Sequence, residues 1–239
     1  MQRKHCFLFS VPFAAAILLL ITFLWTVCYV VLAFTRLLPL EKLIAVGDVY
    51  QLVQGLGATV ILLSRMKYTS RKYLLLGTGL AVFSWTVGQL FWFSYTLLAN
   101  TPLPYPSVGD LGFTGAYFFL IGVIGLLSKD CPKSPFAPLA FIILLVPALL
   151  ATSQSTLTVK LYNVVLGCAA AYTLYKAIPL GKHKKYRWFL CGILLLVFTD
   201  VVFMISVVYF RDSFTMTSAP LYPLALSVAT YGILKGEAG

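Results

Sequence analysis

Long apolar runs that almost no charge interrupts make up most of this sequence, and they limit its possible folds more than any other feature. A helix rises 1.5 Å per residue, so about 20 apolar residues cross a bilayer core of about 30 Å. About eight runs of near this length use up most of the 239 residues, of which only 10% are charged. The sequence therefore predicts an all-α, polytopic membrane protein with about eight transmembrane helices. We place these spans at residues 11–34, 46–64, 73–98, 109–127, 136–151, 161–178, 188–210 and 219–235.

The Lys and Arg residues fall mainly in alternate loops, and this pattern orients the predicted helices. Cytoplasmic loops of membrane proteins carry an excess of Lys and Arg. The basic segments are Arg3 and Lys4; Arg65, Lys67, Arg71 and Lys72; Lys129 and Lys133; Lys182, Lys184, Lys185 and Arg187; and Lys235. Both termini are therefore predicted to be cytoplasmic. The net charge of +11 then reflects topology and anionic lipid rather than nucleic-acid binding.

Residues 1–239 are predicted to form a single transmembrane domain with a weak internal repeat. The halves, about 1–128 and 129–239, would each cross four times and so be related in parallel topology. In register, Val87–Trp92 meets Phe198–Phe203. The fifth span, 136–151, is the shortest and is broken by prolines, but without it the basic loops would no longer alternate.

Polar side chains within the predicted spans favour the outer half of the membrane. They are Asp48, Gln51, Gln54, Gln89, Asp110, Asn163 and Asp200. An ionisable group at the centre of a span costs at least about 2.5 kcal/mol, and such groups within spans tend to face the bundle interior. One interpretation is an outward-facing polar pocket; the other is that these groups hold helices together or cap them. Ser107 is the expected N-cap of the fourth helix, whereas Gln89 and Asp200 are far from any cap.

Trp85, Gln89 and Trp92 are spaced to share one helix face, so two indoles flank an amide. This face is either a platform for an apolar or ring-bearing ligand, or simple packing with Trp92 in the outer aromatic belt. The predicted ligand-binding residues are Trp85, Gln89, Trp92, Asp110, Asp200, Gln51 and Asn163.

Catalytic and cofactor-binding patterns are missing from the sequence. The two histidines, His5 and His183, lie at the predicted cytoplasmic rim, and no span carries a lysine at mid-membrane. We therefore expect no catalytic residue, no metal and no cofactor. A pair of aspartates that activates water, Asp110 with Asp200, is the one chemical alternative.

Two stretches resemble a known family. The helix Trp85–Trp92 followed by Pro106-Ser-Val-Gly-Asp110, with a later Asp-bearing helix at Thr199–Phe203, is similar to the multi-pass membrane sensor regions of bacterial diguanylate cyclases and histidine kinases. The resemblance implies a place in the bacterial cytoplasmic (inner) membrane and a signalling role. Gln89 stands where that family has an acidic residue, and no output domain follows Gly239, so a signal would pass through a partner.

A weaker resemblance, to lysoplasmalogenase-type membrane hydrolases, rests on the eight spans and on Gly192–Asp200 with Tyr231. That resemblance implies a lipid-active enzyme with an Asp in each half, a requirement that Gln89 does not meet.

The function expected from the sequence is thus a non-catalytic, sensor-like protein of the lipid bilayer. It would bind a small or lipidic ligand in an outward-facing polar and aromatic pocket and act through a membrane-protein partner. The alternatives are an accessory subunit of a membrane complex, a lipid-active intramembrane hydrolase and a small-solute transporter.

Overall fold

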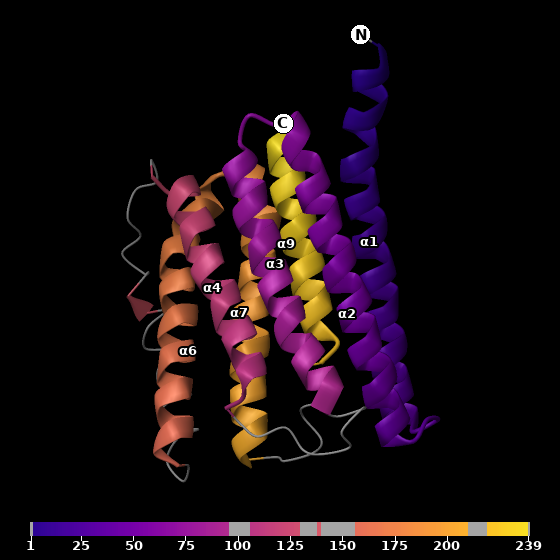
Figure 1. The fold of residues 1–239 in the computed structure, drawn as a ribbon, viewed down its shortest axis with the longest axis vertical. Coiled ribbons are helices and arrows are strands. Elements are labelled where there is room, and N and C mark those ends of the chain that lie inside the picture. The colour runs from indigo at the N-terminus through magenta and orange to yellow at the C-terminus, as the bar shows by residue number, and fades with distance from the viewer. Residues whose placement is uncertain (1, 96–105, 130–137, 140–155, 210–218, 239) are drawn as a thin grey trace.

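The computed structural model describes residues 2–95, 106–129, 138–139, 156–209 and 219–238. Seven long helices make up nearly all of this part, which contains no strand, so the predicted all-α class is confirmed (Figure 1). The helices are α1 (Gln2–Thr35), α2 (Leu40–Arg65), α3 (Lys72–Phe93), α4 (Val108–Leu127), α6 (Leu157–Ala177), α7 (Arg187–Tyr209) and α9 (Leu221–Ala238). Short 3-10 turns, η1 (Met66–Tyr68), η3 (Ile178–Lys182) and η4 (Lys184–Tyr186), lie in the connections.

Six of these helices, all except α9, are long and apolar enough to cross a membrane. The chain is accordingly a membrane-embedded helical protein. The predicted spans coincide with the seven helices apart from the fifth, 136–151, which lies almost wholly outside the described residues. Eight crossings and the internal repeat therefore remain predictions.

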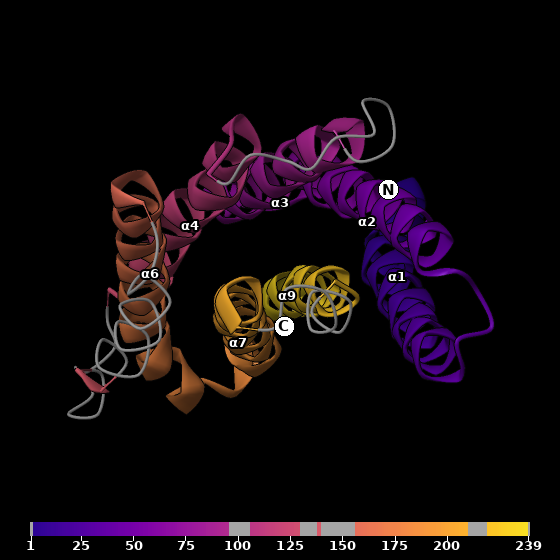
Figure 2. The same cartoon turned by 90° about the horizontal axis from the view of Figure 1, so that it is seen from below.

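The helices form an arc with a hairpin inside it. Figure 2 shows α1, α2, α3, α4 and α6 following one another around the arc, with α7 and α9 on its concave side. α9 contacts α1, α2, α3 and α7, so it joins the inner hairpin to the first three helices of the arc.

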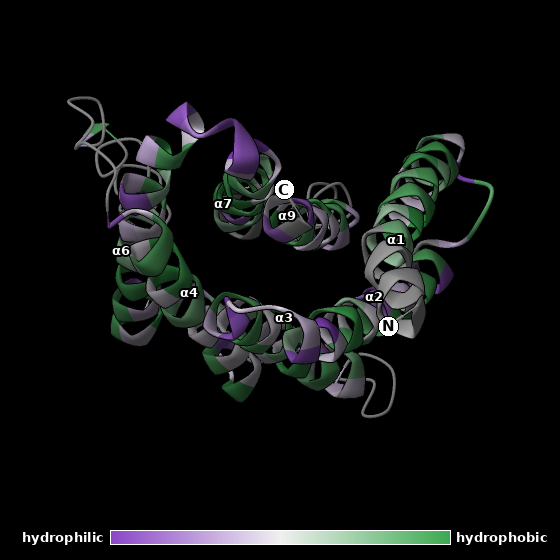
Figure 3. Ribbon diagram, turned by 90° about the horizontal axis from the view of Figure 1, so that it is seen from above, coloured by the Kyte–Doolittle hydropathy of each residue, from purple (hydrophilic) through white to green (hydrophobic). Residues whose placement is uncertain are grey.

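The two ends of the bundle differ in charge. α1 begins and α9 ends at the same end, and the segments after α2 and α6 lie there too (Figure 1). Figure 3 views this end and shows hydrophilic residues in the connection between α6 and α7 and around the start of α3. We call it the basic end, because it carries Arg65, Lys67, Arg71, Lys72, Lys182, Lys184, Lys185, Arg187 and Lys235. The opposite end is called the far end.

Glycines let neighbouring helices approach closely. A Cβ built on Gly112 of α4 would lie 2.6 Å from the backbone N of Gly88 in α3. In the hairpin of α7 and α9, a Cβ on Gly232 would lie 2.5 Å from the carbonyl carbon of Trp188 and 2.6 Å from the Cα of Phe189. Lipid tails are as apolar as the helices, so no hydrophobic force drives the helices together. They associate through van der Waals contact instead, which small residues strengthen by letting the backbones approach.

Candidate functional site

Asp200, in the far half of α7, is buried and accepts hydrogen bonds from two tyrosines. The Tyr222 hydroxyl on α9 donates to Oδ1 at 2.6 Å, and the Tyr117 hydroxyl on α4 donates to Oδ2. The residue is only 7% exposed. A single carboxylate therefore connects α4, α7 and α9.

Aromatic rings from four helices gather around this carboxylate. The Trp85 ring lies 5.6 Å from that of Tyr222 and 5.8 Å from that of Phe113, both in tilted contact. Tyr162 on α6 interacts electrostatically with both Tyr117 and Tyr222. The Asp200 cluster is defined here as Trp85, Phe113, Tyr117, Tyr162, Asp200 and Tyr222.

No cation balances Asp200 within the described residues. The ion pair found there joins Arg71 and Glu237 at the basic end, and the hydrogen-bond partners of Asp200 are the two neutral tyrosine hydroxyls. Buried carboxylates in proteins are ordinarily paired with a positive charge or a metal. This carboxylate is thus hydrogen-bonded but has no counter-ion in the described chain.

Thr114 adds an unused hydroxyl to the face of α4 that carries Tyr117. Most threonines in these helices donate to the carbonyl four residues earlier, as Thr78 and Thr86 do at 2.8 Å. For Thr114 that carbonyl belongs to Asp110, and it accepts the Tyr162 hydroxyl at 3.5 Å instead. The Thr114 Oγ1 is buried and finds no hydrogen-bond partner among the described residues.

Asp110 begins α4 in a capping role. Its Oδ2 accepts the backbone N–H of Ser107 at 2.5 Å, and the Ser107 side chain accepts the backbone N–H of Asp110, so the two residues form a capping box. The Ser107 hydroxyl also donates to Oδ2 at 3.0 Å. Ser107 is confirmed as the N-cap. The backbone carbonyl of Asp110 connects it to the Asp200 cluster through the Tyr162 hydroxyl.

Gln89 lies outside the Asp200 cluster. Its Nε2 donates to Oδ1 of Asp48 on α2 at 3.0 Å, in a buried contact. Trp92, one turn further along α3, makes an edge contact with Phe203 at 6.1 Å between ring centres. Trp85 and Trp92 therefore pack against different aromatic rings.

The seven predicted ligand-binding residues are all at least partly buried, but they do not form one site. Trp85 and Asp200 belong to the Asp200 cluster and Asp110 lies beside it, whereas Gln89 and Trp92 have separate partners. Gln51 and Asn163 are buried at 4% and 2% exposure.

Three tyrosines of the Asp200 cluster were not among the predicted residues. Tyrosine counts as hydrophobic in the composition, and near a membrane surface it is taken as part of the aromatic belt. A search for polar groups therefore passes over Tyr117, Tyr162 and Tyr222. Spacing was the available signal: Asp110, Thr114 and Tyr117 recur at helical intervals and so share one face of α4.

A second polar network connects α1, α2 and α9 nearer the middle of the bundle. The Gln54 Nε2 donates to Ser227 Oγ at 2.7 Å, and Ser227 Oγ lies 3.0 Å from Thr22 Oγ1. The Tyr50 hydroxyl donates to the same Thr22 oxygen at 2.9 Å. Gln54, predicted as a polar residue of the outer half, thus anchors α9.

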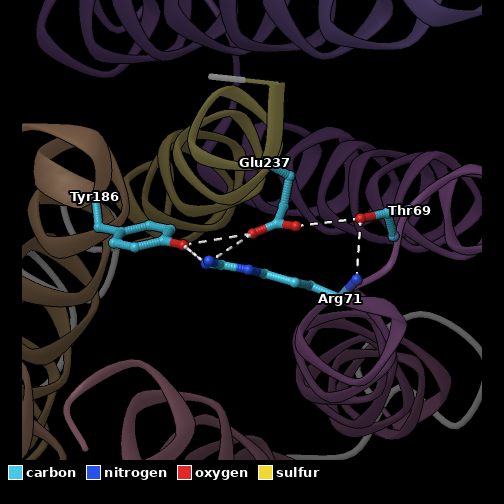
Figure 4. Close-up of polar contacts among 4 residues, drawn as sticks. All are labelled: Thr69, Arg71, Tyr186 and Glu237. Atoms are coloured by element: carbon cyan, nitrogen blue, oxygen red, sulfur yellow. Dashed lines mark hydrogen bonds and ion pairs between the residues drawn. The ribbon is translucent and has the colours of Figure 1, made fainter. Parts of the chain in front are cut away.

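At the basic end, Glu237 ties α9 to the start of α3 and to η4 (Figure 4). Its side chain is 4% exposed and lies 3.8 Å from the Arg71 guanidinium. The Thr69 and Tyr186 hydroxyls donate to its two carboxylate oxygens at 3.2 and 3.4 Å. Arg71 also donates to the Tyr186 hydroxyl at 2.6 Å. Sequence reasoning missed this cluster, because Glu237 lies beyond the last predicted span, 219–235.

We expect Glu237→Gln to lower the free energy of unfolding by about 1.5 kcal/mol, the size of a hydrogen bond to a charged group. Arg71 is half exposed, so solvent screens the ion pair and the two hydroxyl donors account for most of the loss. Titration with denaturing detergent in mixed micelles measures the change. Glu41→Gln, at an exposed site near the far end, is the matched control. An equal effect of the two substitutions would contradict the assignment.

Comparison with protein-family models, curated proteins and solved structures finds no match.

Proposed function

We propose that this chain is a non-catalytic, sensor-like membrane protein that binds a small or lipidic ligand at the Asp200 cluster and acts through a membrane-protein partner. One observation carries the proposal: Asp200 is a buried carboxylate in an apolar helix, and its described partners are uncharged.

The energies involved argue against a purely structural Asp200. An aspartate at the centre of a membrane helix costs at least about 2.5 kcal/mol. Hydrogen bonds between membrane helices contribute about 0.6 kcal/mol each on average, so the two tyrosines recover about half of that cost. An ionisable residue kept at such a cost is expected to serve a function, and ligand binding supplies one.

The chemistry of the cluster indicates which ligands it would suit. Asp200 would attract a positive charge or a strong hydrogen-bond donor, and the ring of Trp85 and the three tyrosines would pack against a cationic or ring-bearing group. The Thr114 hydroxyl would provide a further polar contact.

α9 provides a route from the ligand to the other side of the membrane. Tyr222 lies at its far end in the Asp200 cluster, and Glu237 lies at its basic end. A ligand that replaced the Tyr222 hydroxyl at Asp200 would release the far end of this helix. Any resulting shift would reach the contacts of Glu237, where a partner could detect it.

We further propose that the basic end faces the cytoplasm and that the protein lies in a bacterial inner membrane. The gathering of Lys and Arg at one end supports this orientation. Eight crossings also fit the directions of the helices: α4 and α6 run the same way, and α9 ends on the side where α1 begins (Figure 1). In this orientation the Asp200 cluster lies in the outer half.

The hydrogen bonds favour binding over hydrolysis. A pair of aspartates that activates water must share that water. The Asp110 carboxylate is instead engaged by Ser107, and each oxygen of Asp200 accepts a tyrosine hydroxyl.

Native mass spectrometry of the full chain, extracted in mild detergent, tests the proposal. We expect a small molecule to co-purify with the wild type and Asp200→Asn to retain it about tenfold less, which corresponds to about 1.4 kcal/mol. Asp48→Asn makes the same chemical change in a buried pair outside the cluster, and it should retain the ligand. Equal retention by the wild type and Asp200→Asn, or no bound molecule in any sample, would reject the proposal.

A further inference from the structure

Arg65 is a buried arginine in the last turn of α2, at the basic end. It is 5% exposed. Leu62 and Ala58, three and seven residues earlier, are fully buried, so Arg65 continues the inward-facing stripe of the helix. The neighbouring Lys67 is exposed, as a basic residue at a membrane surface ordinarily is.

The Arg65 guanidinium has a nitrogen without an acceptor in the part of the chain that the structure describes. Its Nη1 is buried without a hydrogen-bond partner, and the structure shows no ion pair for Arg65 in the residues that it describes. Among the described carboxylates, Glu237 is the one at this end, and it is engaged by Arg71, Thr69 and Tyr186 (Figure 4). Arg71 thus has a carboxylate although it is half exposed, whereas the buried Arg65 has none.

The buried Arg65 guanidinium would be stabilised by a bound anion. Arginine does not lose its proton in proteins, so burial cannot be accommodated by neutralising the side chain. A buried charge without a partner is strongly destabilising. The planar guanidinium fork matches the oxygens of a phosphate group, with which it forms two parallel hydrogen bonds.

The surroundings favour an anion that bears phosphate. This end carries further exposed basic residues, including Lys67, Lys72, Lys185 and Lys235, and they would raise the local concentration of anions. The position of Arg65, at the very end of an apolar helix, is also the depth at which lipid headgroups lie.

We propose that Arg65 is the base of a binding site for a phosphate-bearing anion at the basic end of the bundle. The anion is either the headgroup of an anionic phospholipid or free phosphate, which share this chemistry. The site is distinct from the Asp200 cluster, which lies in the other half of the bundle.

The melting temperature of the purified full chain in an uncharged detergent tests this site, with phosphatidylglycerol and inorganic phosphate as separate probes. A ligand that binds only the folded state raises the melting temperature, by about 5 °C for a site well above half saturation in a chain of this size. We expect this rise for the wild type. Arg65→Gln should show less than about a fifth of it, and Lys67→Gln, which removes an exposed positive charge nearby, should keep most of it.

The pattern of responses identifies the anion. A rise with phosphatidylglycerol alone assigns the site to a lipid headgroup, and a rise with phosphate as well assigns it to the phosphate group itself. Arg65→Lys, which keeps the charge and loses the fork, should respond less than the wild type. Without either probe, Arg65→Gln should melt no lower than the wild type. A lower melting temperature there, an unchanged response of both Arg65 variants, or no response of the wild type to either probe would overturn the proposal.

Discussion

Gly232→Ala should lower the free energy of unfolding by about 3 kcal/mol, the upper end of the cost of inserting a methylene into a well-packed core. The added Cβ would meet the backbone atoms of Trp188 and Phe189 in α7, at 2.5 and 2.6 Å from the nearest carbons. Backbone cannot rotate away as a side chain can, so α7 and α9 would have to separate. Because α9 packs against four other helices, the displacement would disturb the whole bundle.

Gly122→Ala is the matched control for this prediction. A Cβ on Gly122 of α4 would meet nothing within 4 Å, and alanine favours helix over glycine by about 1 kcal/mol. We therefore expect Gly122→Ala to leave stability unchanged or slightly raised, as measured by titration with denaturing detergent in mixed micelles. If Gly232→Ala were as stable as Gly122→Ala, the close approach of α7 and α9 would be wrong.

Removing both tyrosine hydroxyls from Asp200 should have a similarly large effect. The double variant Tyr117→Phe/Tyr222→Phe keeps both rings but leaves the carboxylate buried without a donor. Two average hydrogen bonds between membrane helices contribute about 1.2 kcal/mol together, but a charge left inside the bundle without any donor also keeps its desolvation cost, so the total loss is about 3 kcal/mol or more. We expect the free energy of unfolding to fall by about this amount.

The Asp200→Asn background separates this effect from simple loss of packing. An uncharged amide needs its donors less, so the same pair of Tyr→Phe changes should cost less than about half as much there. Tyr73→Phe, at an exposed site, controls for the loss of a tyrosine hydroxyl and should change little. An equal cost in both backgrounds would show that the tyrosines do not act through the carboxylate.

The positions of the helices could be predicted because hydropathy reports the bilayer directly. The span predicted at 109–127 is the helix Val108–Leu127, and its N-cap, Ser107, was identified from residue type alone. The span predicted from residue 46 begins earlier, at Leu40, because Glu41 suits the first turn of a helix although it is unsuited to lipid. Hydropathy thus indicates the part of a helix that is suited to lipid and not the full length of the hydrogen-bonded helix.

The contacts between helices could be predicted only in part. Asp200 and Trp85 were identified as candidates and belong to one cluster, but Gln89 donates to Asp48 outside it. The neighbours of each helix are determined by the way the bundle forms an arc with a hairpin inside it. Helices that are apolar on every side carry little periodic signal of that arrangement.

Arg65 illustrates a related limit. In the sequence it belongs to a run of basic residues between two spans and reads as one more loop charge. Its burial follows from its place on the inward stripe of α2, which becomes clear only when the neighbouring Leu62 and Ala58 are seen to be buried.

The central place of α9 has a consequence for how the protein is made. The helices of the arc precede α9 in the sequence, so they leave the ribosome and enter the bilayer first. Until α9 follows, Thr22 and Gln54 lack the Ser227 hydroxyl that bridges them, and the inner side of the arc is open to lipid. The growing chain therefore passes through a stage at which the Gln54 amide lies in the membrane before its Ser227 acceptor has been inserted.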